Sequence, residues 1–393
     1  MGKLEQQLEQ AVKDGKVPHA VVYATNKDGS FTYSHAAGYN ILGTDDPIPE
    51  DAVFMLASQT KLMASISALQ VVEKGLIGLD DDVAGTLPDL CEQPIIKGFD
   101  DKDEPILVKR EGKITLRHLL THTAGLVYDA GHPHLIKLQA KRGNKPNEGS
   151  TVESRFTYPL VFEPGTNWTY SCSIDWAGKL VERLTGQTLE EHMKENLWGP
   201  LGITGISFWP YENSELKDKV PALTARSPDG KLVLNTEPTI NTGSKGCFGG
   251  HGAYARMGDY IKILHSILAN DGKILKPETV EMMFTPQLSP GAKAGLKAFR
   301  EGPYAGMMIG ENDPKIEADW GLGGILFMQD DDGRRKKGTL NWGGITNPFW
   351  LVDREAGLAL TFGTQVLPPG DGPTSETITV VEKGVYELAG VKF

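Results

Sequence analysis

The sequence predicts an α+β fold in which one antiparallel sheet, flanked by helices, is built from both ends of the chain and a mainly helical region is inserted between them. Apolar and polar residues alternate near both ends, while apolar residues recur at helical spacing in the middle. At 393 residues, with 39% hydrophobic and 23% charged residues, the composition is that of an ordinary globular protein. We expect a discontinuous sheet domain of residues 1–56 and 245–393, a helical domain of residues 57–244, and a functional site between them.

The expected strands form three hairpins. The first is "HAVVYATNKDGSFTYSHAAGYN", residues 19–40, in which apolar and polar residues alternate on both sides of the turn "KDG". Near the other end, residues 324–328 and 337–342 flank "QDDDGRRK", and residues 349–352 and 358–362 flank "DREAG". A helical pattern, "SETITVVEKGVYELAG", closes the chain.

Helical periodicity dominates the centre of the chain, and it predicts helices over residues 58–74, 115–121, 173–184, 189–197, 257–268 and 277–284. Two long segments rich in glycine and proline, "GHPHLIKLQAKRGNKPNEGS" and "SPGAKAGLKAFREGPYAG", are predicted to be loops. Loops of this length often form lids or walls of binding sites.

The stretch "FMLASQTKLMAS", residues 54–65, contains a serine and a lysine three positions apart at the start of an apolar helix. Residues i and i+3 share a helix face, so Ser58 Oγ and Lys61 Nζ can lie within hydrogen-bond reach. The free amides and dipole of the first turn, together with burial, disfavour a proton on Lys61, which suits a base that activates a serine nucleophile. The alternative is a capping serine followed by a surface lysine. A second SxxK, from Ser214 to Lys217, lies in a polar segment and is interpreted as a cap or loop.

Three further strings, "ITLRHLLTHTAGL", "EPGTNWTYSCSIDWAGKLVERLTG" and "NLWGPLGI", follow the SxxK in order. With it, they resemble the family of class C serine β-lactamases, penicillin-binding peptidases and family VIII carboxylesterases over nearly the whole chain. The strings "LASQTKL", "GKITLRHLLTHTAGL" and "DWAGKLVERLTG" are most similar to the fungal branch that includes the lovastatin side-chain acyltransferase and statin esterases. The resemblance implies a β-lactamase/transpeptidase-like fold.

The resemblance also implies catalytic roles for three residues. Ser58 matches the family's nucleophile, Lys61 its base, and Tyr170 the residue that passes a proton to and from the leaving or entering group. For Tyr170 the alternative is a packed aromatic side chain with one satisfied hydroxyl. Tyr211 begins a literal Tyr-x-Asn, but its flanking residues do not resemble the family.

The segment "GTLNWGGITNPFWLVD" resembles the family's strand that faces the nucleophile. Trp342, Gly343 and Gly344 occupy its three motif positions, and the backbone N–H of Ile345 is expected to form an oxyanion hole with that of Ser58. The alternative is an edge strand with a tight glycine bend.

Two departures from the family pattern disfavour β-lactamase or peptidase activity. Trp342 stands where those enzymes have a lysine that meets the substrate carboxylate, and tryptophan carries no charge. Cys172 replaces the asparagine of the Tyr-x-Asn motif, and a thiol is a weak hydrogen-bonding group. Both changes remove polar recognition of a β-lactam and leave the acyl-transfer residues.

The sequence therefore predicts a serine carboxylesterase that forms an acyl-Ser58 intermediate, and the resemblance implies a bulky, statin-like polyketide ester with a short acyl side chain as its substrate. The alternative is an acyltransferase that takes the acyl group from a thioester, for example on an acyl carrier protein, to a polyketide alcohol. A β-lactamase or peptidase and a noncatalytic binding protein are less favoured. The predicted substrate-binding residues are Trp342, Gly343, Gly344, Cys172 and Phe349. Aromatic residues near the site in sequence are able to form an apolar cleft, although core packing is their usual role: Trp168, Trp176, Trp342, Phe349 and Trp350.

Other patterns exclude several classes of site. There is no GxSxG elbow, no P-loop and no HExxH in the sequence. The pairs His118 and His122, and His132 and His134, lack a neighbouring carboxylate or cysteine cluster. No cofactor and no metal are expected, and His122 is predicted to hold the "THTAGL" loop under the site.

Charge and hydropathy restrict the partners and the location. A formal charge of −11 argues against nucleic acid or an anionic membrane as the main partner and favours a neutral or cationic ligand. The family resemblance implies that this ligand is a small-molecule ester. No apolar run approaches the ~18 residues that a membrane span needs. Three isolated cysteines suggest reduced thiols, and the polar start of the chain does not resemble a secretory signal, so a cytoplasmic location is expected.

Overall fold

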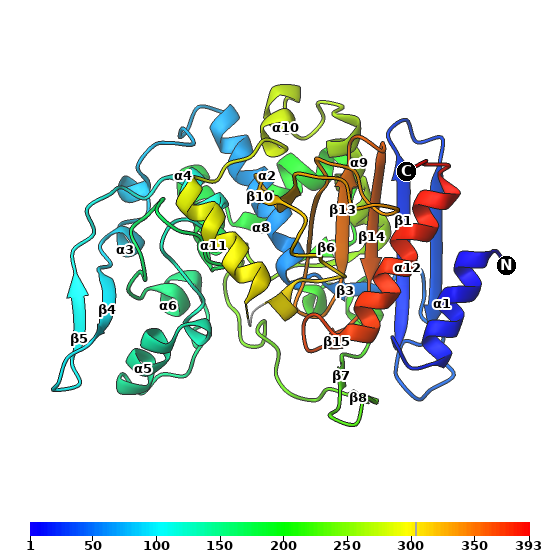
Figure 1. Ribbon diagram of the computed structural model, residues 1–393, viewed down its shortest axis with the longest axis horizontal. Coiled ribbons are helices and arrows are strands. Elements are labelled where there is room, and N and C mark those ends of the chain that lie inside the picture. Colours follow the sequence, from blue (N-terminus) through cyan, green and yellow to red (C-terminus); the bar gives the residue numbers. More distant parts are fainter. Residues whose placement is uncertain (303–304) are drawn as a thin grey trace.

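A seven-stranded antiparallel sheet forms the centre of the computed structural model, which describes residues 1–302 and 305–393 (Figure 1). Its strand order is β10–β11–β12–β13–β14–β1–β2. The strands are β1 (His19–Asn26), β2 (Thr32–Gly38), β10 (Ala318–Trp320), β11 (Ile325–Phe327), β12 (Leu340–Gly343), β13 (Phe349–Asp353) and β14 (Leu358–Gly363). Strand β1 pairs with β14, so the two ends of the chain meet within one sheet.

The three predicted hairpins are confirmed. Strand β1 pairs with β2, β11 with β12, and β13 with β14, each antiparallel. Strand β13 is buried on both faces, and its side chains alternate between two apolar clusters. Trp350 faces the cluster on the helical side, whereas Phe349 faces the cluster under the terminal helices.

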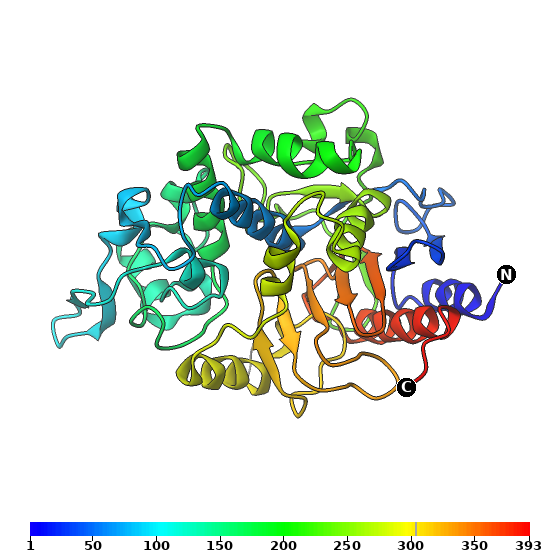
Figure 2. The ribbon, with the colours of Figure 1, turned by 90° about the horizontal axis from the view of Figure 1, so that it is seen from above.

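Helices cover both faces of the sheet (Figure 2). Helices α1 (Lys3–Lys13) and α12 (Gly372–Leu388) pack on one face, with Leu8 and Val385 among the buried contacts. Helices α9 (Met257–Ala269) and α2 (Thr60–Glu73) lie on the other side (Figure 2). This three-layer arrangement buries the apolar strands from both sides.

Helix α2 is the central helix of the molecule. Every residue from Thr60 to Val71 is buried, so it is a core helix with no solvent face. It follows β3 (Val53–Met55) and a single 3₁₀ turn, η1 (Ala57–Gln59), and it ends before Gly75, which has a left-handed φ of +70°.

The predicted helices are all present, with small shifts at their ends. They are α2, α4 (Leu116–Leu120), α7 (Ser173–Thr185), α8 (Leu189–Met193), α9 and α10 (Pro277–Met283), and α8 continues as a π turn over Lys194–Trp198. Two further short helices are α3 (Pro88–Cys91) and α6 (Val152–Phe156). There are three smaller sheets in the described part of the chain. One consists of β3, β9 (Tyr254–Arg256) and β6 (Ile206–Ser207), and a second of β15 (Val366–Leu367), β7 (Thr224–Arg226) and β8 (Leu232–Leu234). The third pairs β4 (Ile95–Phe99) with β5 (Pro105–Val108).

The two segments predicted as long loops each contain a helix, so that prediction was wrong. They form α5 (Pro133–Lys141) and α11 (Pro290–Glu301), while residues 303 and 304 of the second segment lie outside the described part. Proline is favourable in the first helical turn, and the Ser289 side chain caps α11 by accepting the amide of Ala292. Buried apolar residues such as Leu135 and Leu296 then outweigh the low helix propensity of glycine.

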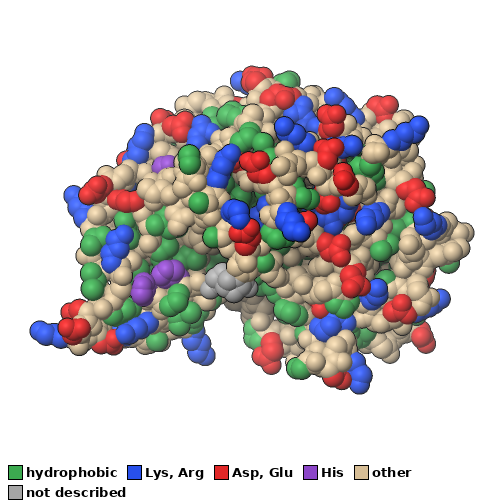
Figure 3. All heavy atoms as spheres, viewed as in Figure 1, with side chains coloured by type: hydrophobic (Ala, Val, Ile, Leu, Met, Phe, Trp, Pro, Cys, Tyr) green, Lys and Arg blue, Asp and Glu red, His purple; other side chains and the backbone are tan. Residues whose placement is uncertain are grey.

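The proposed division at residues 56/57 and 244/245 stays a prediction. One apolar cluster runs from the sheet into the helical region and includes Val21, Leu120 and Trp350. On the face that Figure 3 shows, acidic and basic side chains are interspersed. None of the described helices has the length and apolar character needed to cross a membrane.

Candidate active site

Ser58 and Lys61 are in contact at the start of α2. Lys61 Nζ donates a hydrogen bond of 2.7 Å to the carbonyl of Gly250 and lies within hydrogen-bond distance of two hydroxyls, Ser58 Oγ at 3.2 Å and Tyr128 at 3.1 Å. Lys61 is 1% exposed, so it is a buried lysine and not the surface lysine of the alternative interpretation. Ser58 does not cap the helix, because it lies inside the turn η1 and the position before α2 is Gln59.

The backbone before the serine has an unusual conformation. Ala57 has a φ of +45°, in the left-handed region that residues other than glycine rarely adopt. Such strain typically costs about 1–3 kcal/mol and is concentrated at functional sites, where the surrounding fold holds it in place. Here it turns the chain sharply from β3 into α2 and leaves Ser58 half-buried at a cavity wall.

Tyr170 lies beside the lysine. Lys61 Nζ is 4.8 Å from the centre of the Tyr170 ring, and the Tyr170 hydroxyl accepts a hydrogen bond of 3.1 Å from Trp342 Nε1. His122, below it, has its ring centre 4.9 Å from that of Tyr170 and its Nδ1 2.9 Å from Ser171 Oγ. Burial, reinforced by the charge of Lys61, holds the pKa of His122 well below its usual value, so this ring is a neutral support under Tyr170.

The end of β12 approaches Ser58 because two glycines follow Trp342. A Cβ at Gly344 would lie 2.3 Å from the carbonyl oxygen of Leu56, so only glycine allows this contact between the two segments. The amide of Ile345 lies in the turn that follows and has no hydrogen-bond acceptor among the described residues. It is therefore a donor available at the cavity wall.

These residues surround one cavity of about 290 Å³. Its size is close to the lower end of the ~300–1,000 Å³ typical of small-molecule sites. The predicted site residues on its wall are Ser58, Tyr170, Trp342, Gly343, Gly344 and Ile345. The rest of the wall is mainly apolar, with Ala57, Val127, Ala130, Ile240, Phe299, Met307 and Ile309 among its residues.

Phe349 and Cys172, both predicted to bind substrate, do not line this cavity. Phe349 is fully buried and points to the opposite face of the sheet, because side chains alternate along β13 and Trp350 takes the inner face. Cys172 is fully buried before α7, and its Sγ lies 3.4 Å from the Tyr158 hydroxyl. Both predictions need correction: these residues pack behind the site. Trp168, Trp176 and Trp350 are likewise core residues.

Two contributors to the site were missed in the sequence. Tyr128 lies 67 positions after Lys61 and yet contacts its amino group. His251 lines the cavity, is buried, and pairs its Nδ1 with Asn241 Oδ1 at 2.7 Å. Neither residue belongs to a spacing motif, and only the glycine-rich string "GGHGAY" around His251 suggests a close backbone approach.

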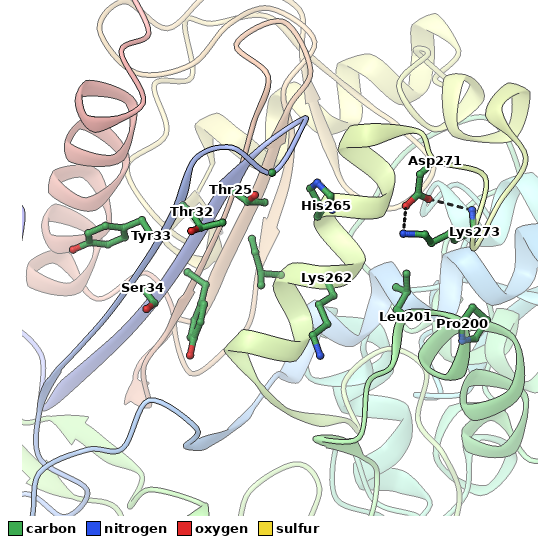
Figure 4. Close-up of a pocket in the computed structure, with 14 residues that line it drawn as sticks. Thr25, Thr32, Tyr33, Ser34, Pro200, Leu201, Lys262, His265, Asp271 and Lys273 are labelled. Carbon is green, nitrogen blue, oxygen red and sulfur yellow. Dashed lines mark hydrogen bonds and ion pairs between the residues drawn. The ribbon is translucent and has the colours of Figure 1, made fainter.

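A second, open cavity of about 600 Å³ lies between the β1–β2 hairpin and α9 (Figure 4). In Figure 4, Thr25, Thr32 and Ser34 lie on the sheet side, facing His265 and Lys262 on α9. Asp271 forms an ion pair with Lys273 and accepts a hydrogen bond from Ser266. None of the predicted site residues lines this larger cavity, so the candidate site is the smaller one at Ser58.

A family model described as Beta-lactamase matches residues 4–382 of the chain. The chain belongs to the beta-lactamase family. Lovastatin esterase from Penicillium rubens is 40% identical over 370 residues, which are 93% of this chain and 93% of that protein. Monacolin J acid methylbutanoyltransferase from Aspergillus terreus is 37% identical over 391 residues, 98% of this chain and 95% of that protein. The LovD6 mutant of simvastatin synthase from Aspergillus terreus superposes with a TM-score of 0.91 at 37% identity and covers 99% of this chain and 95% of that one.

These comparisons confirm the predicted family, its fold and the resemblance to its fungal branch of esterases and acyltransferases. Trp342 occupies the first position of the predicted strand motif, at the end of β12. Its Nε1 donates a hydrogen bond to the Tyr170 hydroxyl, and its ring carries no positive charge. Among the described residues that line this cavity there is no lysine or arginine.

Proposed function

We propose that this protein is a serine carboxylesterase that forms an acyl ester on Ser58 and cleaves a short acyl side chain from a bulky polyketide ester. The observation that carries the proposal is the contact between Ser58 Oγ and the buried Lys61 Nζ, at 3.2 Å, on the wall of a cavity that also holds Tyr170 and the Ile345 amide. A nucleophile, its base and an amide donor around one cavity are what acyl transfer requires.

In the first half of the reaction, Ser58 Oγ attacks the carbonyl carbon of the ester and its proton passes to Lys61. The amides of Ser58 and Ile345 stabilise the resulting oxyanion, and loss of one such donor typically costs about 3–4 kcal/mol of barrier. When the carbon–oxygen bond to the alcohol breaks, Tyr170 gives its proton to the leaving oxygen and recovers one from Lys61. Trp342 Nε1, at 3.1 Å, orients the tyrosine hydroxyl for this transfer.

In the second half, an incoming hydroxyl resolves the acyl-Ser58 ester. Tyr170 takes the proton of this hydroxyl and passes its own proton to Lys61, while the hydroxyl oxygen attacks the acyl carbon. When the bond between the acyl group and Ser58 breaks, Lys61 returns that proton to Ser58 Oγ. If the hydroxyl belongs to water the product is an acid, and if it belongs to a polyketide alcohol the product is a new ester. An apolar wall is compatible with either acceptor.

The substrate class rests on the wall of the cavity and on the relatives. The wall is mainly apolar and carries Trp342 in place of a lysine, which supports a neutral substrate group. Relatives named for lovastatin and for monacolin J acid support a polyketide partner with a short acyl group. The alternative function, transfer of that group from a thioester donor such as an acyl carrier protein, is supported by the relatives named as transferases.

The nucleophile is tested with a matched pair of serine variants. Ser58→Ala is expected to lower turnover of an activated butyrate ester by roughly 10⁴-fold or more, as removal of a nucleophile does in serine hydrolases. Ser214→Ala, the serine of the exposed SxxK, is expected to change nothing. Mass spectrometry should find the acyl group on the wild type and not on Ser58→Ala. Equal turnover in the two variants would refute the proposal.

Product partition separates the two functions. The purified protein receives a statin butyrate ester, or 4-nitrophenyl butyrate, with and without the free statin alcohol, and the acid and the new ester are quantified. Butyric acid as the main product with alcohol present supports the esterase. New ester as the main product supports the acyltransferase, and consumption of neither donor supports a noncatalytic binding protein.

A further inference from the structure

Asp175 is a buried carboxylate behind Lys61 that the reaction above does not use. It lies on α7 and is fully buried. Its Oδ1 accepts a hydrogen bond of 2.8 Å from the Gly250 amide, while its Oδ2 has no hydrogen-bond partner among the described residues. A buried charge without full pairing is unfavourable, so its presence calls for an explanation.

Gly250 connects this carboxylate to the lysine. Gly250 donates its N–H to Asp175 and accepts Lys61 Nζ on its carbonyl oxygen at 2.7 Å. A Cβ on Gly250 would lie 2.2 Å from Asp175 Oδ2, so the backbone packs directly against the carboxylate. Asp175 thus fixes the carbonyl that holds the amino group of Lys61.

Charged and titratable groups face Asp175 from four elements: Lys61 on α2, Tyr128 after α4, Arg155 on α6, and His251 before β9. Burial raises the pKa of Asp175 to about 6, against the opposing effects of the Lys61 charge, the Gly250 amide and Arg155. The pKa of Tyr128 is held well above its usual value, mainly by burial and secondly by the charge of Asp175, so Tyr128 keeps its proton. His251 Nε2 is 3.9 Å from Asp175 Oδ1, but burial keeps the pKa of His251 well below 6.5, so the ring is neutral.

We propose that Asp175 is a positioning residue that holds Lys61 through Gly250 and balances the positive charge that Lys61 acquires when it takes the Ser58 proton. The inference rests on the proposed function. In that step the O–H bond of Ser58 breaks and an N–H bond forms on Lys61, while Asp175 neither gains nor loses a proton. Because Lys61 is 1% exposed, its ammonium form needs a counter-charge within the protein.

The charge is tested separately from the hydrogen bond with Asp175→Asn, which keeps an oxygen to accept the Gly250 amide. For 4-nitrophenyl butyrate we expect kcat to fall roughly 10- to 100-fold with KM nearly unchanged, by analogy with the carboxylates that orient metal-binding histidines. Asp175→Ala removes both the charge and the hydrogen-bond acceptor, so its kcat is expected to be lower than that of Asp175→Asn. Asp353→Asn is the matched control, because Asp353 is another fully buried aspartate, at the far end of β13.

The pH profile gives a readout that a merely structural role would not change. In the wild type, the rate of Ser58 acylation is expected to fall as the pH drops through about 6, because Asp175 is then protonated and its charge is lost. At neutral pH, the acylation rate of Asp175→Asn should be lower than that of the wild type. It should not fall further as the pH drops through about 6. Neutral His251 and His122 do not titrate there, because burial lowers both pKa values well below 6.5.

Each outcome decides the inference. If Asp175→Asn acylates with the rate and pH profile of the wild type, the charge has no role and the inference is wrong, although the proposed function stands. If that variant does not fold, a wild-type acylation rate that stays constant between about pH 5 and pH 7 overturns the inference equally. If the wild type acquires no acyl group on Ser58, the proposed function fails, and the inference fails with it.

Discussion

At the residue scale, Trp342 makes two kinds of contribution to the site. Its Nε1 donates to the Tyr170 hydroxyl, and its ring centre lies 5.1 Å from that of Tyr170 and 4.8 Å from that of Trp320. One side chain therefore supplies a hydrogen-bond donor and an apolar wall. This combination suits a tyrosine that must hold its proton in a fixed direction next to a neutral substrate.

Trp342→Phe separates these two contributions. The phenylalanine ring keeps most of the apolar surface of the tryptophan but cannot donate a hydrogen bond to Tyr170. Such a hydrogen bond is typically worth about 0.5–1.5 kcal/mol, so kcat should fall roughly 2- to 10-fold. KM for a short-chain ester should change little. Steady-state kinetics on 4-nitrophenyl butyrate measure both values. Trp350→Phe is the control, since Trp350 pairs with Trp342 across the strands but has no partner for its Nε1 among the described residues. A larger loss of kcat in the control would contradict the assigned role of the donor.

The residues of the site differ in how far the sequence predicts them. Ser58 and Lys61 are three positions apart on one helix, so local geometry was enough to predict their contact. Tyr128 and Asp175 reach the same lysine through tertiary packing, for which a single sequence carries no spacing signal. Phe349 was predicted wrongly because proximity along the chain does not specify which face of a strand a side chain occupies.

At the element scale, the site depends on the close approach of β12 to the segment between β3 and α2. Gly344 permits it, because any Cβ there would lie 2.3 Å from the Leu56 carbonyl oxygen. The backbone of Gly344 is not left-handed, so the requirement comes from space and not from φ. The motif predicted a strand that faces the nucleophile, but the distance between the two segments came only from the structure.

Gly344→Ala is expected to separate the two segments and displace the Ile345 amide from Ser58. Overpacking of this kind typically costs about 1–3 kcal/mol of folding stability. Loss of one amide donor typically lowers kcat by about 10²- to 10³-fold. Gly372→Ala is the matched control, because a Cβ at Gly372, in the first turn of α12, meets nothing within 4 Å. Thermal unfolding and kinetics should show loss only for Gly344→Ala, and normal activity in that variant would exclude the proposed oxyanion hole.

Among the elements, the hairpins and the helices with clear apolar periodicity were predicted, and the helices α5 and α11 were not. Their segments contain glycine and proline, whose low propensity outweighed the periodic signal in the sequence. In the structure both helices begin with proline and bury one apolar stripe. Tertiary contacts therefore decide what local propensity leaves ambiguous.

At the scale of the whole molecule, the last helix closes the outer face of the sheet and connects distant parts of the chain. Arg335, between β11 and β12, makes a two-pronged contact with Glu382 on α12, at 2.6 Å from Nε and 3.0 Å from Nη2. Both side chains are buried, and Arg334 Nε lies 3.6 Å from the same carboxylate. Near the end of the same helix, Glu387 pairs with Lys3 of α1 at 2.9 Å, but both of these side chains are exposed.

The two ion pairs on α12 should therefore differ in their contribution to stability. Glu382→Ala leaves Arg335 buried without its carboxylate, and breaking a buried pair in this way typically costs about 3–5 kcal/mol. Glu387→Ala removes an exposed pair, which water and salt already screen, so the unfolding midpoint should stay close to that of the wild type. Urea unfolding followed by circular dichroism measures both variants on the same helix. If the two substitutions destabilise the protein equally, α12 is held by its apolar face alone, and the Arg335–Glu382 contact fixes the register of the helix without stabilising the fold.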